Sequence, residues 1–137
     1  MNLSFTQVKE TCIYVTDLDI ARNFYQGKLG LKMFSYVPNR HIFFKAGSSV
    51  FLCFIAEATK NDTSLPPHYG SGTTHFAFEC EQEMYTAWKQ KIVAVGIAIE
   101  QEVRWPNGGQ SFYFRDPDNH LVEIVEQGMW DFADEMK

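Results

Sequence analysis

The sequence predicts an α+β fold made of two βαβββ modules, and three observations favour it. Short runs in which apolar and polar residues alternate are typical of strands. Each half of the chain also holds one longer segment with apolar residues at helical spacing. The order strand, helix, strand, strand, strand occurs twice, and the copies begin about 65 residues apart, at Glu10 and His75. We therefore expect a single domain with module 7–58 and module 73–127 joined by loop 59–72.

In the first module, the alternating run at 8–15 predicts the opening strand. A helix should follow, with Asp17 or Asp19 as its N-cap and Gly30 at its end, because glycine readily adopts the left-handed conformation found there. Its apolar face is predicted to consist of Ile20, Phe24 and Leu29. Three further strands are expected at 31–37, 41–47 and 50–58.

Loop 59–72 is polar and rich in Pro, Gly and Ser, which indicates a linker or a flap. In the second module we expect a strand at 74–80 and a helix at 81–96. The helix should bury Met84, Trp88, Ile92 and Val95. Strands are then expected at 97–103, 109–116 and 120–126. The last two should form a hairpin, because the Asp-Pro-Asp-Asn sequence at 116–119 favours a turn.

The composition excludes several classes of protein. With 45% hydrophobic residues, 15% aromatic residues and a net charge of −5, the chain can form a core but has no basic surface for nucleic acid. No apolar run is long enough to span a membrane, and the N-terminus does not resemble a signal peptide. Three cysteines without a CxxC motif, Cys12, Cys53 and Cys80, favour a reducing compartment. We expect a cytoplasmic protein.

Three ionisable residues lie within predicted strands. Glu10 and His75 occupy equivalent positions at the start of the first strand of each module, and Glu123 lies in the middle of the last strand. If the duplicated modules lie side by side, one imidazole and two carboxylates could converge, which is a ligand set suited to a divalent metal. Alternatively, the histidine is a hydrogen-bonded structural residue and the glutamates face solvent.

Three segments resemble the vicinal oxygen chelate superfamily, which includes glyoxalase I, bleomycin-resistance proteins, fosfomycin-resistance thiol transferases and extradiol dioxygenases. They are YVTDLDIARNFYQGKLGLK at 14–32, GTTHFAFEC at 72–80 and FYFRDPDNHLVEI at 112–124. The resemblance implies a cup-shaped incomplete barrel and a homodimer. By position it implies that Glu10, His75 and Glu123 bind one divalent ion (Mn, Fe, Ni, Zn or Mg), with Glu10 and Glu123 as catalytic residues.

The chain also departs from the family pattern. Glu10 stands where His or Gln is usual. The place of the fourth glyoxalase I ligand falls around Leu52 to Phe54, where no residue is a good ligand for a hard metal. Ser111 and Tyr113 match substrate and cation positions of the fosfomycin-resistance enzymes. The basic residue expected after the last strand is replaced by an acidic segment, 127–137, which argues against a phosphonate substrate.

Seven residues are candidates for substrate binding: Cys12, Tyr14, Cys53, His68, Trp105, Tyr113 and Arg115. Arg115 could bind a substrate carboxylate or pair with Asp116 or Asp118. His68 could act as an acid or base carried by a lid, or be a solvated loop residue. The two cysteines are expected to line the cup as small apolar side chains.

Two classes of function are therefore expected. The first is a metal-dependent enzyme that uses the ion as a Lewis acid on a small oxygen-bearing substrate, with isomerase, lyase or thiol-transferase chemistry. The second is a metal-free protein that sequesters a small molecule between aromatic walls, as bleomycin-resistance proteins do. An iron-dependent ring-cleaving dioxygenase is a further alternative. We expect no nucleic-acid or membrane partner.

Overall fold

The computed structural model describes residues 2–131, in which two compact units follow one another along the chain, Met1–Gly72 and Thr73–Lys137. Each unit contains a four-stranded mixed sheet, with strand order β1-β4-β3-β2 in the first and β5-β8-β7-β6 in the second. In both sheets the first strand pairs in parallel with the last strand of its unit, and the other pairs are antiparallel. The predicted α+β fold with two βαβββ modules is confirmed.

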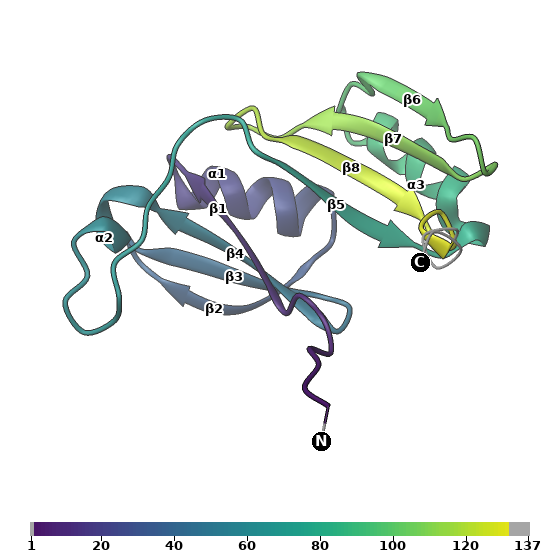
Figure 1. The fold of residues 1–137 in the computed structure, drawn as a ribbon. Coiled ribbons are helices and arrows are strands. Elements are labelled where there is room, and N and C mark those ends of the chain that lie inside the picture. The colour runs from purple at the N-terminus through teal and green to yellow at the C-terminus, as the bar shows by residue number, and fades with distance from the viewer. Residues whose placement is uncertain (1, 132–137) are drawn as a thin grey trace. The chain divides into compact units, whose positions relative to one another are not determined.

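The first unit follows the predicted order with one addition (Figure 1). Its strands are β1 (Glu10–Val15), β2 (Lys32–Val37), β3 (His41–Ala46) and β4 (Ser49–Ile55). The α-helix α1 (Leu18–Arg22) continues into a π-helical segment, η1 (Asn23–Lys28). The expected strand at 50–58 is wrong at its end, because the chain turns into the short helix α2 (Ala56–Lys60).

Asp17 caps α1, as predicted, since its Oδ1 atom accepts hydrogen bonds from the backbone amides of Asp19 and Ile20. Gly30 follows the helical segment with a φ of 78°. The predicted apolar face is wrong at Ile20, whose exposed fraction is 52%. The buried side of α1 and η1 instead consists of Leu18, Ala21, Phe24, Tyr25 and Leu29.

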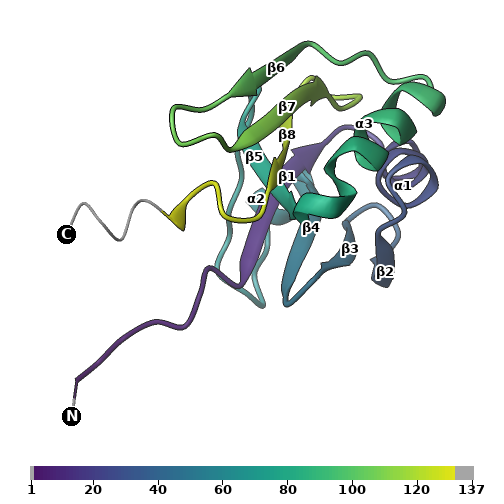
Figure 2. The ribbon, with the colours of Figure 1, turned by 90° about the vertical axis from the view of Figure 1, so that its right-hand side faces the viewer.

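The second unit contains the strands β5 (His75–Cys80), β6 (Gln101–Arg104), β7 (Gln110–Arg115) and β8 (Leu121–Glu126). A 3₁₀ turn, η2 (Gln82–Met84), leads into α3 (Tyr85–Ala94), which lies beside β7 and β8 (Figure 2). Residues 97–100 do not belong to a strand, so β6 is shorter than predicted.

The buried side of α3 also differs from the prediction. Met84 is 52% exposed, whereas Tyr85 is buried and its ring packs against Phe112 at a centroid distance of 5.6 Å. Ile92 is buried as expected. The prediction treated residues 81–96 as one continuous α-helix. Because the 3₁₀ turn η2 precedes α3, that spacing places Met84 on the wrong side of the helix.

The predicted hairpin between β7 and β8 is present, and one carboxylate organises its turn. Asp116 Oδ1 accepts hydrogen bonds from the backbone amides of Asp118 and His120, and Oδ2 lies 2.8 Å from His120 Nδ1. Asn119 adopts a φ of 68°, a conformation that asparagine tolerates. None of the helices between residues 2 and 131 has the length and apolar character needed to cross a bilayer.

Candidate functional site

The registers of the two sheets show that the predicted ligands occupy matching places. Glu10 begins β1 and pairs with Val50 of β4, and His75 begins β5 and pairs with Leu121 of β8. Two residues further along, Ala77 pairs with Glu123 in the second sheet, and Cys12 pairs with Leu52 in the first. Leu52 is therefore the first-unit counterpart of Glu123. At this position only the last strand of the second unit carries a carboxylate.

His75 and Glu123 lie together in the second unit. The Nε2 atom of His75 is 3.2 Å from Glu123 Oε1, and its Nδ1 atom is 2.9 Å from the carbonyl oxygen of Leu121. Because a carbonyl only accepts hydrogen bonds, Nδ1 must carry the proton and donate it. In neutral His75 the Nε2 lone pair then faces the carboxylate of Glu123, whose residue is only 6% exposed.

This pair has the features of two metal ligands. Two atoms with lone pairs 3.2 Å apart repel one another unless a proton or a metal ion lies close to both. Nitrogen and oxygen ligands bind zinc at about 2.0–2.2 Å, so two ligands of one ion lie about 3 Å apart. A ligating histidine also commonly donates its other N–H group to a backbone carbonyl, as His75 does to Leu121.

Ser111 and Tyr113 lie on β7, next to the strand that carries Glu123. Trp105 Nε1 donates to Ser111 Oγ at 3.0 Å, and Ser111 is fully buried. Tyr113 pairs with Glu123 between β7 and β8, and its ring lies 5.9 Å from the His75 ring. Burial raises the pKa of Tyr113, contact with the Ser111 side chain lowers it, and the charge of Glu123 raises it further. Tyr113 therefore remains a phenol beside the carboxylate.

Glu10 belongs to the first unit, where it shares one face of β1 with Cys12 and Tyr14. It is exposed. No group of three His, Cys, Asp or Glu residues gathers as a metal site within 2–131, so two of the three predicted ligands lie together and the third stays a prediction. Burial, with the nearby charge of Glu10 as a smaller cause, raises the pKa of the Cys12 thiol. This disfavours a thiolate nucleophile.

Cys53 does not share a face with Cys12, so the prediction that both line the cup is wrong. Cys53 pairs with Ile13 and Ile42, both buried, and is itself fully buried. Strand alternation places these residues on the face opposite Cys12, the face that α1 and η1 cover.

His68 contacts the first sheet. Its Nδ1 atom is 2.7 Å from the Tyr14 hydroxyl oxygen, and its ring packs edge-on against Phe54 with a centroid distance of 4.7 Å. Its backbone amide donates to the carbonyl of Thr59, which closes residues 59–68 into a compact loop. Loop 59–72 is therefore anchored on the sheet. His68 packs against this sheet and is not a fully solvated loop residue.

Arg115 is paired with an acidic residue outside the turn and also bonds the turn itself. Its Nε and Nη2 atoms lie 2.8 and 3.3 Å from the two carboxylate oxygens of Glu100. Hydrogen bonds from Arg115 lower the pKa of Glu100. Its Nη1 atom donates to the carbonyl oxygen of Asn119 at 3.2 Å, so Arg115 has a structural role at the hairpin.

Sequence reasoning missed a polar network at the start of β3. Arg40 Nη1 donates to His41 Nδ1, and Arg40 Nη2 lies 2.9 Å from Asp62 Oδ2. His41 Nε2 is 3.1 Å from Ser35 Oγ. Since arginine only donates, His41 Nδ1 accepts and Nε2 carries the proton. Burial, followed by the charge of Arg40, lowers the pKa of His41 and keeps it neutral. Strand alternation through β3 could have placed His41 beside Phe43, but not beside Arg40 and Asp62.

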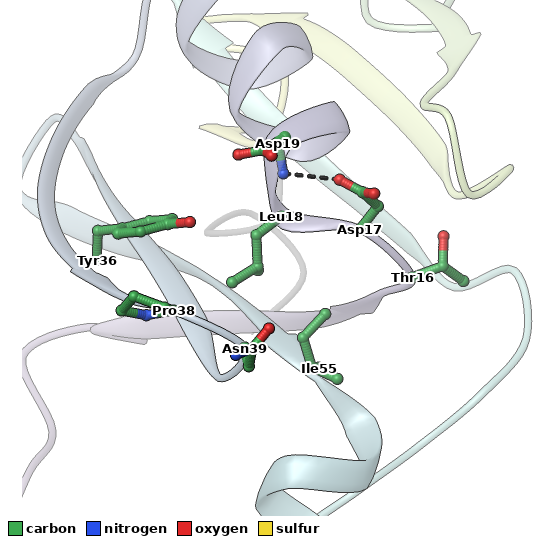
Figure 3. Close-up of a pocket in the computed structure, with 8 residues that line it drawn as sticks. All are labelled: Thr16, Asp17, Leu18, Asp19, Tyr36, Pro38, Asn39 and Ile55. Atoms are coloured by element: carbon green, nitrogen blue, oxygen red, sulfur yellow. Dashed lines mark hydrogen bonds between the residues drawn. The ribbon is translucent and has the colours of Figure 1, made fainter.

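A hollow of about 300 Å³ lies elsewhere on the first unit, beside the start of α1 (Figure 3). Leu18 and Tyr36 line it from opposite sides, with Asp17, Asp19 and Asn39 at its rim. The carboxylate of Asp17 is already used to cap the helix. The hollow therefore does not belong with the predicted metal ligands.

Comparisons with known proteins agree with this fold. The model of the Glyoxalase/Bleomycin resistance protein/Dioxygenase superfamily matches residues 7–124, and the chain belongs to this superfamily. A crystal structure of lactoylglutathione lyase from Agrobacterium tumefaciens is 34% identical, with a TM-score of 0.87, and the match covers 93% of this chain and 98% of that one.

Two transferases are more distant relatives. Metallothiol transferase FosB from Bacillus licheniformis is 26% identical over 85% of this chain and 73% of the relative. Glutathione transferase FosA from Serratia marcescens is 28% identical over 80% of this chain and 73% of the relative. The resemblance seen in the sequence is thus confirmed at the level of the superfamily.

Proposed function

We propose that this protein is a metal-dependent enzyme in which Glu10, His75 and Glu123 bind one divalent ion. The geometry of His75 and Glu123 is the single observation that carries the proposal. An imidazole whose proton is committed to the Leu121 carbonyl points its lone pair towards a buried carboxylate 3.2 Å away. A metal ion stabilises such a pair, and a site made only for packing has no need of it.

The proposed reaction acts on a small oxygen-bearing substrate, by isomerase, lyase or thiol-transferase chemistry. The bound ion would supply Lewis acidity towards the substrate oxygen. Glu10 and Glu123 would take the catalytic roles, and Tyr113 would hold Glu123 in position. The names of the relatives support this class, since they include a lyase and two thiol or glutathione transferases. Mn, Fe, Ni, Zn and Mg are the candidate ions, because the ligand set is rich in oxygen.

A metal-free binding protein is the second candidate, and the aromatic rings on the first sheet favour it. Phe43, Phe54 and His68 form edge-on or stacked contacts on the face that carries Tyr14. Such a surface could sequester a planar molecule without chemistry. An iron-dependent dioxygenase remains an alternative within the metal-dependent class. Metal content separates the binding protein from both enzymes.

The decisive experiment is elemental analysis of the full chain, purified without an affinity metal or chelator. We expect about one equivalent of metal in the wild type and its loss in Glu10→Gln, His75→Ala and Glu123→Gln. Glu102→Gln is the matched control, because Glu102 lies in the same unit but pairs with Lys89. Circular dichroism verifies that each variant folds. Absence of metal, even after incubation with each candidate ion, would overturn the proposal. Retention of metal in Glu10→Gln alone would remove only Glu10 from the ligand set.

We further propose a cytoplasmic homodimer, as is common for this superfamily. Light scattering coupled to size-exclusion chromatography tests the dimer, and a monomeric mass would contradict it.

A further inference from the structure

The face of the first sheet that carries Glu10 also carries a continuous row of rings, here called the aromatic row. Each ring in it lies within 6.4 Å of the next, measured between centroids. Register pairs place the rings on one face, since Phe54 is opposite both Tyr14 and His41. The members of the row are Phe34, Phe43, His41, Phe54, His68 and Tyr14.

The aromatic row is distinct from the hydrophobic core of the unit. The core lies on the other face, where Phe44 and Phe51 are almost fully buried and contact Tyr25 of η1. In the row, Phe34 is 46% exposed and Phe43, Tyr14 and His68 are half-buried, whereas Phe54 and His41 are buried. A set of partly exposed rings away from the core indicates a binding surface.

Hydrogen bonds fix the row in one arrangement. The His41 ring stacks on Phe43 at 3.8 Å with an angle of 10° between planes, and both of its nitrogens are engaged, by Arg40 and Ser35. The Arg40 guanidinium lies over the Phe54 ring at 5.6 Å. At the other end, Tyr14 holds His68. A surface whose side chains are already ordered loses little entropy when a ligand binds.

The row lies along β1 and β4 at a defined distance from Glu10. A strand rises about 3.3 Å per residue, so Cys12 is about 7 Å and Tyr14 about 13 Å from Glu10 along β1. Phe43 is level with Leu52, which pairs with Cys12. Because β3 lies two strands away from β1 and strands are about 4.8 Å apart, the Cα atom of Phe43 lies about 12 Å from that of Glu10, and the Cα atom of His41 about 16 Å.

We propose that the aromatic row is the specificity subsite for a planar aromatic group of the substrate. This inference rests on the proposed function in one respect: the oxygen-bearing end of the substrate is taken to lie at Glu10. The substrate class is then an aryl compound in which a linker, spanning about 12–16 Å, separates the ring from the metal-binding oxygens. Edge-on and stacked contacts with the row would favour an aromatic ring over a saturated ring of equal size.

The test uses three probes: a 2-naphthylalkyl hydroxamate, its decahydro-2-naphthylalkyl counterpart, and 2-naphthylacetamide, which lacks the metal-binding head. Isothermal titration calorimetry would measure binding to the full chain, both metal-free and loaded with Mn. We expect 2-naphthylacetamide to bind the metal-free protein. We also expect the naphthyl hydroxamate to bind about five- to tenfold more tightly than the decahydronaphthyl compound.

Variants locate the binding. Phe34→Ala and Phe43→Leu should each weaken naphthyl binding about fivefold or more. Tyr36→Ala is the matched control, because Tyr36 is an exposed ring on the same strand as Phe34 but faces Arg22 of α1. It should leave binding unchanged. Equal affinity for naphthyl and decahydronaphthyl probes, or equal effects of Phe34→Ala and Tyr36→Ala, would overturn the inference.

Failure of the proposed function would look different. If Mn does not tighten hydroxamate binding while 2-naphthylacetamide still depends on Phe34 and Phe43, the aromatic subsite stands and the metal chemistry fails.

Discussion

His75 Nε2 lies 3.2 Å from Glu123 Oε1, and the opposite ring nitrogen of His75 donates to the Leu121 carbonyl. The first prediction follows from this arrangement. In ¹⁵N NMR spectra of the metal-free protein, the His75 proton shared with Leu121 should be seen on Nδ1. Addition of Zn²⁺, which is diamagnetic, should shift Nε2 and leave the Nδ1 proton in place. A shift at Nδ1, or none at either nitrogen, would contradict metal binding by Nε2.

Tyr113 should affect metal affinity without being a ligand itself. Tyr113→Phe removes the hydroxyl group of the residue paired with Glu123, so the carboxylate should lose a positioning contact. We expect metal affinity to fall about tenfold, as for other outer-shell partners of metal ligands. Competition with a fluorescent chelator measures it. Tyr69→Phe in loop 59–72 is the control, and an equal fall in both variants would contradict the positioning role.

Stability should depend on the charge of His41. Its pKa is lowered in the folded state, so as pH falls below about 6.5 the unfolded chain takes up the proton first. The free energy of unfolding should therefore decrease towards acid, by up to about 1.4 kcal/mol per pH unit from this residue. Urea unfolding between pH 8 and 5 measures the effect. In His41→Gln the slope should be smaller, and an unchanged slope would refute the assignment.

The anchoring of loop 59–72 depends on a glycine. A Cβ atom at Gly70 would lie 2.9 Å from Cε2 of the Tyr14 ring, too close for unstrained packing. Gly70→Ala should therefore displace the loop and weaken the contact between Tyr14 and His68. Hydrogen exchange of the loop amides, followed by mass spectrometry, should accelerate. Ser71→Ala serves as the control, and equal exchange in both variants would show that the loop does not rely on this contact.

Tyr85 offers a stabilising substitution. Its hydroxyl group is buried and has no hydrogen-bond partner among the described residues. Burial raises the pKa of Tyr85 strongly, with the charges of Glu102 and Glu126 adding to the effect. Tyr85→Phe keeps the ring against Phe112 and removes the unsatisfied group, so the free energy of unfolding should rise by about 1 kcal/mol. Urea denaturation at pH 7 measures it, and a loss of stability would indicate that the hydroxyl group has a partner.

Local features of the fold were predictable because their determinants are close in sequence. The Asp17 cap, the hairpin at 116–119 and the strand alternation that groups Glu10 with Tyr14 each depend on residues a few positions apart. The error at Met84 arose because the 3₁₀ turn η2 precedes α3 and changes the helical spacing. At Ile20 the choice of face was wrong, because the sheet packs against Leu18 and Ala21 of the same helix.

The two-module order, the superfamily and the ionisable residues within the strands follow from the sequence alone. Which of these groups meet follows from the tertiary structure. It pairs His75 with Glu123 and commits the His75 proton to Leu121, assigns Arg115 to Glu100, and joins Arg40 to Asp62. The partners in these contacts are 15 to 48 residues apart along the chain. Such contacts depend on strand register and loop closure, which the pattern of neighbouring residues does not encode.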